Sequence, residues 1–324
     1  MQGARRRPAL ENEDKNLSEQ TLKPTVGFIG LGAMGSAMVK RIAEGGYRLK
    51  VLDVDTERAG RLARELGASL AATPADLAQD CDVVITMLPT SAIVEDVLFG
   101  TNGAGDALQP GAIFIEMSSG APAQTVEMAT RIAKLGATLV DAPVSGGVAR
   151  ARVGDLAIMF GGSDQAYAQA EPVLRTMGSS IVRTGAVGSA HAMKALNNLV
   201  SAGGFLIGAE ALLIGTRFGL DAETMVDVLN ASTGMNNSTQ KKFKQFVLSR
   251  KFDAGFGLDL MVKDIGIALG IADKTETGAP FAALCRQLWS GAQKHLGPGH
   301  DHTEMVKFSE LLAGSPITPA AGGK

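Results

Sequence analysis

The sequence contains few cysteines, no excess of positive charge and no uninterrupted apolar run of membrane-spanning length. Its two cysteines, Cys81 and Cys285, lie far apart and lack the spacing of metal ligands. They offer no disulfide framework, which favours a reducing compartment, so we expect a cytoplasmic protein. The formal net charge of −2 argues against nucleic acid as a partner, since nucleic-acid surfaces usually require a basic face.

The longest apolar candidate, residues 199–215, is interrupted by Glu210 and several glycines. A membrane span needs about 20 apolar residues, so we expect this segment to be a helix buried inside the protein, with no membrane as partner. Residues 1–24 have no apolar stretch for a secretory signal, and their acidic residues are atypical of a mitochondrial transit peptide. We interpret residues 1–24 and 314–324 as flexible tails.

Short apolar runs alternate with amphipathic segments from residue 25 to residue 187. Several runs carry apolar residues at consecutive positions, which is typical of strands covered on both faces. The predicted strands are residues 25–30, 48–53, 82–88, 112–117, 137–142, 156–161 and 180–184, and helices are predicted at 33–45, 56–66, 91–99, 122–134 and 164–176. This alternation predicts an α/β fold with a Rossmann-type, doubly wound, mainly parallel sheet.

Several of these helices begin with recognisable signals. Thr56 and Ser91 are candidate N-caps, and Pro74 (after Thr73) and Pro122 are candidate first-turn prolines.

The pattern changes after Gly188, where no clear strand remains. Helical periods recur at residues 190–218, 221–231, 238–248, 258–274, 279–294 and 302–312. The chain is long enough for two domains, each with a core. We therefore predict a dinucleotide-binding Rossmann domain at residues 25–187 and an all-helical substrate and oligomerisation domain at 188–313, joined by a long helix.

Glycines follow the first predicted strand at a spacing that dinucleotide-binding turns use. The segment "VGFIGLGAMGSAM" (26–38) places Gly30, Gly32 and Gly35 between a strand and a helix. Such glycines permit a tight turn, close approach of a pyrophosphate and close packing of helix on sheet. The helix N-terminus then offers free N–H groups and a favourable dipole. We expect this turn to bind the cofactor through Gly30, Leu31, Gly32, Ala33, Met34 and Gly35.

Asp53 closes the second predicted strand, 18 residues after Gly35. An acidic residue there hydrogen-bonds the adenosine ribose and repels the extra phosphate of NADP. No arginine follows it directly, because Val54 and Asp55 come next and Arg58 stands at the start of the helix. The sequence favours NAD over NADP, although Asp53 has the alternative interpretation of a plain turn residue.

Three further stretches share a pattern with one protein family. They are "DAPVSGG" (141–147), "GSAHAMKALNN" (188–198) and "LMVKDIGIA" (260–268). Together with "GFIGLGAMG", and in the same order, they resemble the β-hydroxyacid dehydrogenase family, which includes 3-hydroxyisobutyrate dehydrogenase and tartronate semialdehyde reductase. The resemblance covers about residues 25 to 312.

The resemblance implies that Lys194 is the catalytic lysine and that Asn198 is its partner. Residues four apart share a helix face, so both side chains can address one substrate hydroxyl. A partly buried lysine near a cationic ring has a lowered pKa and can act as acid or base near neutrality. The alternative for Lys194 is a solvated surface lysine.

Other positions carry roles by the same resemblance. Ser145, Gly146 and Gly147 correspond to the family's substrate loop, whose hydroxyl and backbone N–H groups suit a carboxylate; a purely structural turn is the alternative. Ser118, followed by Ser119, matches a serine–threonine pair at the edge that faces cofactor and substrate. The stretch that runs under the cofactor is Met87, Leu88 and Pro89. Lys263 is expected to reach back and close the cofactor site, unless it only pairs with Asp264 at the surface.

The segment "STGMNNSTQKKF" (232–243) departs from the family pattern. Its Asn236, Asn237 and Ser238 are candidates for hydrogen bonds to a polar substrate, and Ser238 is equally a candidate N-cap. The stretch "GHDH" (299–302) superficially suggests a metal site, but histidines on such a turn more often cap a helix. We predict no metal.

These features predict an NAD-dependent enzyme that oxidises a small 3-hydroxy acid to its semialdehyde, or catalyses the reverse reduction. Three alternatives remain: a sulfonate-semialdehyde reductase, an imine reductase, and a cofactor-binding scaffold without chemistry. The presence of Lys194 argues against an imine reductase. Apolar residues in "GGFLIGAEALLIG" (203–215) exceed what one helix of a monomer buries, so a homodimer or homotetramer is expected.

Overall fold

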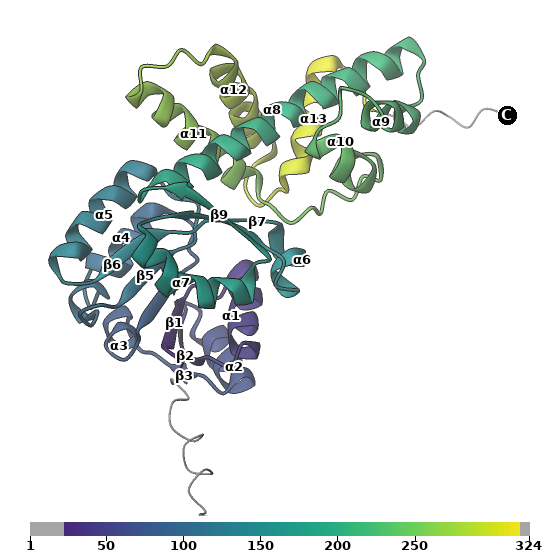
Figure 1. Cartoon of the computed structure of the whole chain (residues 1–324). Coiled ribbons are helices and arrows are strands. Elements are labelled where there is room, and N and C mark those ends of the chain that lie inside the picture. Colours follow the sequence, from purple (N-terminus) through teal and green to yellow (C-terminus); the bar gives the residue numbers. More distant parts are fainter. Residues whose placement is uncertain (1–22, 318–324) are drawn as a thin grey trace, which may run out of the picture.

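The computed structural model describes residues 23–317, and within them a nine-stranded sheet forms the centre of the amino-terminal half (Figure 1). The strand order is β3-β2-β1-β4-β5-β6-β8-β7, with β9 beside β8. Strands β3 to β6 pair in parallel, β8 is antiparallel to β6 and β7, and β9 is parallel to β8. The strands are β1 (Thr25–Ile29), β2 (Arg48–Leu52), β3 (Ser69–Leu70), β4 (Val83–Thr86), β5 (Ile113–Glu116), β6 (Thr138–Asp141), β7 (Val144–Ser145), β8 (Ala157–Gly161) and β9 (Ser180–Gly185).

Helices cover both faces of this sheet, which explains why its central strands are apolar at most positions. All residues of β4 and β5 are buried. One face packs against α1 (Ala33–Glu44), α2 (Thr56–Leu66), α6 (Gly147–Arg152) and α7 (Asp164–Met177). The other packs against α3 (Pro74–Ala78), α4 (Ser91–Phe99) and α5 (Pro122–Lys134). The doubly wound, mainly parallel sheet predicted from the sequence is confirmed.

Helices α2 and α4 begin at the predicted residues, but the N-cap of each is one residue earlier than predicted. Asp55 rather than Thr56 caps α2, because its side chain accepts the N–H of Arg58. Thr90 rather than Ser91 caps α4 in the same way. In both helices the predicted residue has already entered the first turn, where its side chain cannot reach the free N–H groups behind it. The prolines of α3 and α5 occupy the first turn as predicted.

The carboxyl-terminal half is helical and is built around the long helix α8 (Ser189–Phe218), which runs across its middle (Figure 1). Phe205 of α8 packs against Phe243 and Trp289, and all three are fully buried. The other elements are α9 (Ala222–Asn230), α10 (Asn237–Lys241), the π-helical η2 (Phe243–Leu248), α11 (Leu258–Lys274), α12 (Pro280–Leu296), the 3-10 turn η3 (His302–Glu304) and α13 (Met305–Ala313).

Helix α8 is the one helix among residues 23–317 that is long and apolar enough to cross a membrane. Half of its apolar window is buried inside the protein, and it contacts all the other α-helices of the carboxyl-terminal half. It also carries the buried polar side chains of His191, Lys194 and Asn198. This pattern is that of a core helix, as the sequence predicted for this segment.

The chain remains packed at the last described residues. Ile317 is buried against the helical core, and its N–H donates to Glu310 Oε1 at 3.0 Å. Residues 314–317 of the expected carboxyl-terminal tail are therefore part of the folded structure. The rest of that tail, and residues 1–22 of the amino-terminal one, lie outside the described residues.

Candidate active site

The glycine turn between β1 and α1 contains two kinds of glycine. Two of them leave no room for a side chain because the protein packs against them, and one borders open space. A Cβ on Gly30, whose φ is +98°, would lie 2.4 Å from the carbonyl oxygen of Met87. A Cβ on Gly35 would lie 1.8 Å from the carbonyl oxygen of Gly30. By contrast, a Cβ on Gly32 would meet no atom within 4 Å. Gly30 and Gly35 therefore hold the turn against the sheet, while the space beside Gly32 can admit a phosphate.

The amino-terminal end of α1 is available for an anion. Its N-cap is Gly32, so no side chain satisfies the first N–H groups, and its first turn contains no acidic residue. Ala33 is exposed, Met34 is half-buried and Leu31 is buried in the core. An uncapped helix N-terminus with open space beside it fits the pyrophosphate of a dinucleotide.

Asp53 lies at the end of β2, where it supports the glycine turn. Its Oδ2 accepts the N–H of Leu31 at 2.5 Å, and its Oδ1 accepts the N–H of Asp55 at 2.8 Å. The Arg58 guanidinium lies 3.7 Å from Oδ1 and pairs with Asp55 at 2.7 Å. Although Arg58 is five residues away in sequence, the first turn of α2 brings it beside Asp53. The part of the site expected to bind the ribose therefore contains both the negative charge of Asp53 and the positive charge of Arg58.

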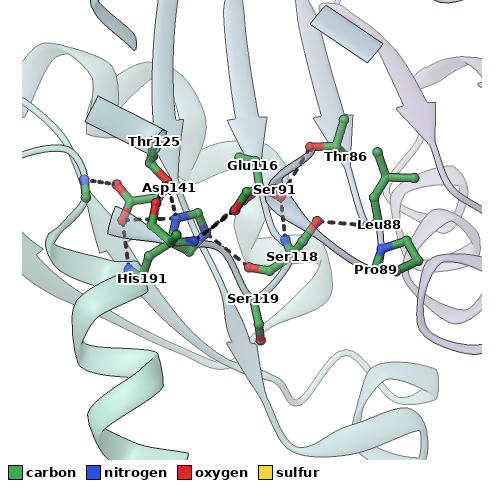
Figure 2. A network of polar contacts seen from close by, with 12 residues as sticks. Thr86, Leu88, Pro89, Ser91, Glu116, Ser118, Ser119, Thr125, Asp141 and His191 are labelled. Carbon is green, nitrogen blue, oxygen red and sulfur yellow. Dashed lines mark hydrogen bonds and ion pairs between the residues drawn. The ribbon is translucent and has the colours of Figure 1, made fainter. Parts of the chain in front are cut away.

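The residues after β4 and β5 form the neighbouring part of the same sheet edge (Figure 2). The N–H of Leu88 donates to Ser118 Oγ at 2.8 Å, and the N–H of Ser118 donates to Glu116 Oε1 at 2.8 Å. Met87 supplies the carbonyl oxygen that lies against Gly30. The predicted stretch Met87–Pro89 and the predicted Ser118 are thus brought together beside the glycine turn.

Lys263 of α11 joins the helical half to this sheet edge. Its Nζ donates to the carbonyl oxygens of Pro89 at 3.1 Å and Ser119 at 2.7 Å. It also lies 3.5 Å from Asp264 Oδ1, but this ion pair is only one of its contacts. Lys263 does reach back from the helical half, as the resemblance implied, and its contact with a cofactor stays a prediction.

Lys194 and Asn198 lie one turn apart on α8, and both side chains are buried. Burial lowers the pKa of Lys194 below its ordinary value; the Asp264 carboxylate opposes this effect, and the Lys263 ammonium adds to it. Nδ2 of Asn198 donates to Asp264 Oδ2 at 2.6 Å. Lys194 is therefore no solvated surface lysine, and a carboxylate from α11 fixes the Asn198 amide.

Asp264 is a site residue that the sequence analysis treated only as a possible partner of Lys263. Its side chain is buried, and Oδ1 accepts no hydrogen bond from any described residue. The Lys263 ammonium lies 3.5 Å from this oxygen, and Oδ1 retains capacity to accept a hydrogen bond from a ligand or a reacting group. In the sequence, the one indication that Asp264 belongs to the site was its position next to Lys263.

The predicted substrate loop follows β6 and contains the short strand β7. Gly146 has a φ of +134° and Gly147 a φ of +67°, conformations that side chains rarely adopt. A Cβ on Gly147 would meet no atom within 4 Å, so its backbone is open to a ligand. The loop begins beyond Asp141, whose carboxylate accepts the N–H groups of Gly188 and His191 at the start of α8. Carboxylate binding by Ser145, Gly146 and Gly147 stays a prediction.

The segment 232–243 is ordered mainly by its own side chains. Asn236, not Ser238, is the N-cap of α10, and it forms a capping box with Thr239. Asn236 also donates to the carbonyl oxygen of Gly204 on α8 at 3.3 Å, while Asn237 is exposed. At the end of α10, burial lowers the pKa of Lys242 to about 8, and its Nζ donates to Ser201 Oγ at 3.0 Å.

The histidines of "GHDH" do not cap a helix. Asp301 caps η3 through a capping box with Glu304, because its short carboxylate reaches the N–H of Thr303. His302 is buried with Nδ1 3.1 Å from the carbonyl oxygen of Phe256. Within residues 23–317, no group of three or more His, Cys, Asp or Glu side chains is arranged to hold a metal ion.

Comparisons with known proteins agree with this geometry. Residues 25–185 match the NAD-binding domain of 6-phosphogluconate dehydrogenase, and residues 188–309 match the NAD-binding domain of NADP-dependent 3-hydroxyisobutyrate dehydrogenase. The chain is 33% identical to 2-(hydroxymethyl)glutarate dehydrogenase of Eubacterium barkeri, over 93% of the chain and 99% of the relative. It is 37% identical to mitochondrial 3-hydroxyisobutyrate dehydrogenase of Homo sapiens, over 82% and 81%.

Solved structures show the same relationship. The 3-hydroxyisobutyrate dehydrogenase of Mycobacterium tuberculosis, determined with L-serine, superposes with a TM-score of 0.79 at 28% identity, covering 88% of this chain and 98% of the other. An imine reductase from Myxococcus stipitatus shares the fold, with a TM-score of 0.61, at only 21% identity.

The Rossmann-type sheet with its open glycine turn and the helical half that matches the family define an NAD(P)-dependent oxidoreductase that acts on a CH–OH group. The chain belongs to the 3-hydroxyisobutyrate dehydrogenase family of β-hydroxyacid dehydrogenases.

The glycine turn yields a matched pair of variants. We expect Gly32→Ala to keep the melting temperature of the wild type but to weaken NADH binding about tenfold or more, because its methyl group fills space beside the helix N-terminus. We expect Gly35→Ala to lower the melting temperature, because its methyl group collides with the Gly30 carbonyl. Thermal unfolding and NADH fluorescence titration measure both effects. Unchanged NADH affinity in Gly32→Ala would contradict this account of the turn.

Proposed function

We propose that this enzyme interconverts a small 3-hydroxy acid and its semialdehyde, with Lys194 as the proton-transfer residue. The observation that carries the proposal is the buried position of Lys194, next to Asn198 and within electrostatic range of Lys263, which itself contacts the sheet edge. A lysine with a lowered pKa can take a proton from an alcohol near neutral pH and return it to an aldehyde.

Each residue of the site has a role in the proposed reaction. When bound, the nicotinamide cofactor accepts or supplies the hydride. Lys194 takes the hydroxyl proton during oxidation, and Asn198, fixed by Asp264, orients the substrate oxygen. The backbone N–H groups of Gly146 and Gly147, with the Ser145 hydroxyl, hold the substrate carboxylate.

The substrate class is narrowed by the relatives. Two of them are named for 3-hydroxyisobutyrate and 2-(hydroxymethyl)glutarate, and both compounds place a primary alcohol two carbons from a carboxylate carbon. We propose a substrate of this kind. A sulfonate semialdehyde is the remaining enzymatic alternative, since a loop built for a carboxylate can accept a sulfonate with small changes. The similarity to imine reductases shows the fold alone.

Replacing Lys194 by alanine tests the proposed role. We expect kcat for oxidation of 3-hydroxyisobutyrate, or of whichever hydroxy acid in a panel is the best substrate, to fall about 100-fold or more. NADH affinity should stay within about twofold of the wild type, because the lysine acts on the substrate. Lys241→Ala, at an exposed lysine of α10, is the control and should keep full activity. A loss of less than about tenfold in Lys194→Ala would exclude the proposed role.

We propose NAD as the preferred cofactor. The Asp53 carboxylate disfavours a 2′-phosphate at the ribose end, which supports NAD. Arg58 lies 3.7 Å from that carboxylate and partly offsets its charge, which supports residual use of NADP. A domain family described for an NADP-dependent enzyme also matches the chain, so the balance between these two charges matters.

The contribution of Arg58 can be measured from the ratio of kcat/KM with NAD to kcat/KM with NADP. We expect this ratio to exceed one in the wild type. It should rise about fivefold in Arg58→Ala, because removal of a partly exposed charge leaves the repulsion from Asp53 unopposed. Arg61→Ala, at an exposed arginine of the same helix, should leave the ratio unchanged. A wild-type preference for NADP would refute the NAD assignment.

We propose that the enzyme is a homodimer or homotetramer in a reducing compartment such as the cytoplasm. Support for self-association comes from a stripe on α8 at heptad spacing, where Val200, Ile207 and Ile214 are 75%, 57% and 71% exposed. Such a stripe covers one face of a helix and is typical of a contact with another helix. The free, buried Cys81 and Cys285 are consistent with a reducing compartment.

Sedimentation measurements test this interface. The wild type should sediment as a dimer or larger species, and Ile207→Glu should shift it toward the monomer, because a charge in the stripe would have to be buried. Val182→Glu, at an exposed position of β9, is the matched control and should not change the sedimentation coefficient. A monomeric wild type would disprove the interface.

A further inference from the structure

A fully buried histidine lies in the first turn of α8, three residues before Lys194 (Figure 2). His191 Nε2 is 2.8 Å from Glu116 Oε2 and 3.1 Å from the carbonyl oxygen of Ser118. Its Nδ1 is 2.7 Å from Thr125 Oγ1. Both ring nitrogens are therefore engaged with the sheet half of the molecule, while the backbone of the same residue continues into the helix that carries Lys194.

The partners of the ring define its protonation. A carboxylate and a carbonyl oxygen only accept hydrogen bonds, so Nε2 carries a proton. Thr125 Oγ1 also lies 3.1 Å from the carbonyl oxygen of Ala121, and we assign its single hydroxyl proton to that carbonyl. With this assignment Oγ1 accepts from Nδ1, which then also carries a proton. This hydrogen-bond assignment makes His191 an imidazolium paired with the Glu116 carboxylate.

The pKa directions agree with that assignment. Burial lowers the pKa of His191 and is the largest single effect, but Glu116, Asp141 and the Ser118 carbonyl together outweigh it, so the pKa is raised. Burial likewise raises the pKa of Glu116, but His191 and the hydrogen bonds from Ser118 together outweigh it, so the pKa of Glu116 is lowered. The other charged group facing the ring is Asp141 on β6, with Oδ2 3.9 Å from Nδ1. Lys194 is the charged residue that follows His191 on the same helix.

Two cations from the helical half hold consecutive carbonyl groups at the sheet edge. His191 holds the carbonyl oxygen of Ser118, and Lys263 holds that of Ser119. The next residue is Gly120, where a Cβ would lie 2.8 Å from His191 Cε1. The Ser118–Gly120 segment is thus packed directly onto the imidazole ring, with no room for a side chain at residue 120.

We propose that His191, as an imidazolium, is a positioning residue for the reaction. It fixes the distance between the Ser118–Ser119 segment, which borders the cofactor site, and the face of α8 that carries Lys194, because residues three apart share a helix face. It contacts neither the expected substrate nor the cofactor. The positioning role rests on the proposed function, whereas the protonation state of His191 can be measured independently of activity.

The His191–Glu116 pair stabilises the fold over a defined range of pH. Because the pKa of His191 is raised on folding, the pair stabilises the fold fully below the ordinary histidine pKa, and this contribution is lost as pH rises through the folded pKa. Because the pKa of Glu116 is lowered, its contribution is present above the ordinary glutamate pKa and is lost as pH falls through the folded pKa. The stabilisation by the pair is therefore complete between the ordinary pKa values of glutamate and histidine, and it is lost on either side as pH passes the folded pKa of Glu116 or of His191.

His191→Gln tests positioning, since glutamine can donate to Glu116 and Ser118 but carries no charge and does not titrate. We expect kcat to fall about 10- to 100-fold, the loss typical of a small displacement of reacting groups, with NADH affinity within about twofold of the wild type. The alkaline limb of the kcat profile should also change shape. Glu116→Gln should lower kcat similarly, and the double variant should lose little more than either single variant.

The matched control is His295→Gln, at an exposed histidine of α12, which should keep the wild-type profile. Unchanged kcat and pH profile in His191→Gln would overturn the positioning role. A loss confined to melting temperature, with kcat of the folded fraction unchanged, would overturn it as well. If Lys194→Ala retains activity while His191→Gln does not, the proposed proton-transfer role has failed and the positioning role has not.

A second measurement applies even if His191→Gln does not fold. Nuclear magnetic resonance of the imidazole nitrogens, assigned through Thr125→Val, should show both nitrogens of His191 protonated at pH 7. Thr125→Val keeps the shape of the side chain but removes the acceptor for Nδ1, so the proton should be lost at lower pH than in the wild type. A singly protonated wild-type ring, or an unchanged titration in Thr125→Val, would overturn the imidazolium assignment.

Discussion

The arrangement of this enzyme depends on the contact between the first turn of α8 and the carboxyl edge of the sheet. That edge holds the ends of parallel strands, so its backbone and side-chain acceptors converge there. Asp141 accepts two N–H groups from the start of α8, and Glu116 Oε2 forms an ion pair with His191 Nε2 at 2.8 Å. These charge-assisted bonds are buried, which makes them strong when complete and costly when broken. They set where the long helix begins and hence where Lys194 and Asn198 lie.

A second contact, from α11, acts on the same edge. Lys263 reaches the carbonyl oxygens of Pro89 and Ser119, and its neighbour Asp264 orients Asn198. One helical turn thereby joins the predicted cofactor segments to the predicted catalytic pair. The same packing sets the pKa of Lys194, because burial lowers it while the Asp264 carboxylate limits the decrease. The charged side chains of the site come from two helices, α8 and α11, and from the ends of two strands, β5 and β6.

Much of the site was predictable because its signals are local in sequence. A glycine turn, an acidic strand end and a lysine four residues before an asparagine each lie within one element, where strand and helix geometry fix the spacing. His191, Asp264 and the approach of Arg58 to Asp53 were missed. Each acquires its role from partners elsewhere: His191 pairs with a residue 75 positions earlier in the sequence, and Asp264 with one 66 positions earlier. Local periodicity contains no information about such pairs.

The sequence by itself determined the class of fold, the boundaries of most elements and the family to which the chain belongs, because hydrophobic period and turn residues act over a few positions. The capping residue was misassigned where two adjacent side chains could both cap, since only the final backbone direction selects between Asp55 and Thr56. Tertiary structure alone decided which buried charges meet. Burial makes an ionised group dependent on its partner, and the fold brings partners together across the whole chain.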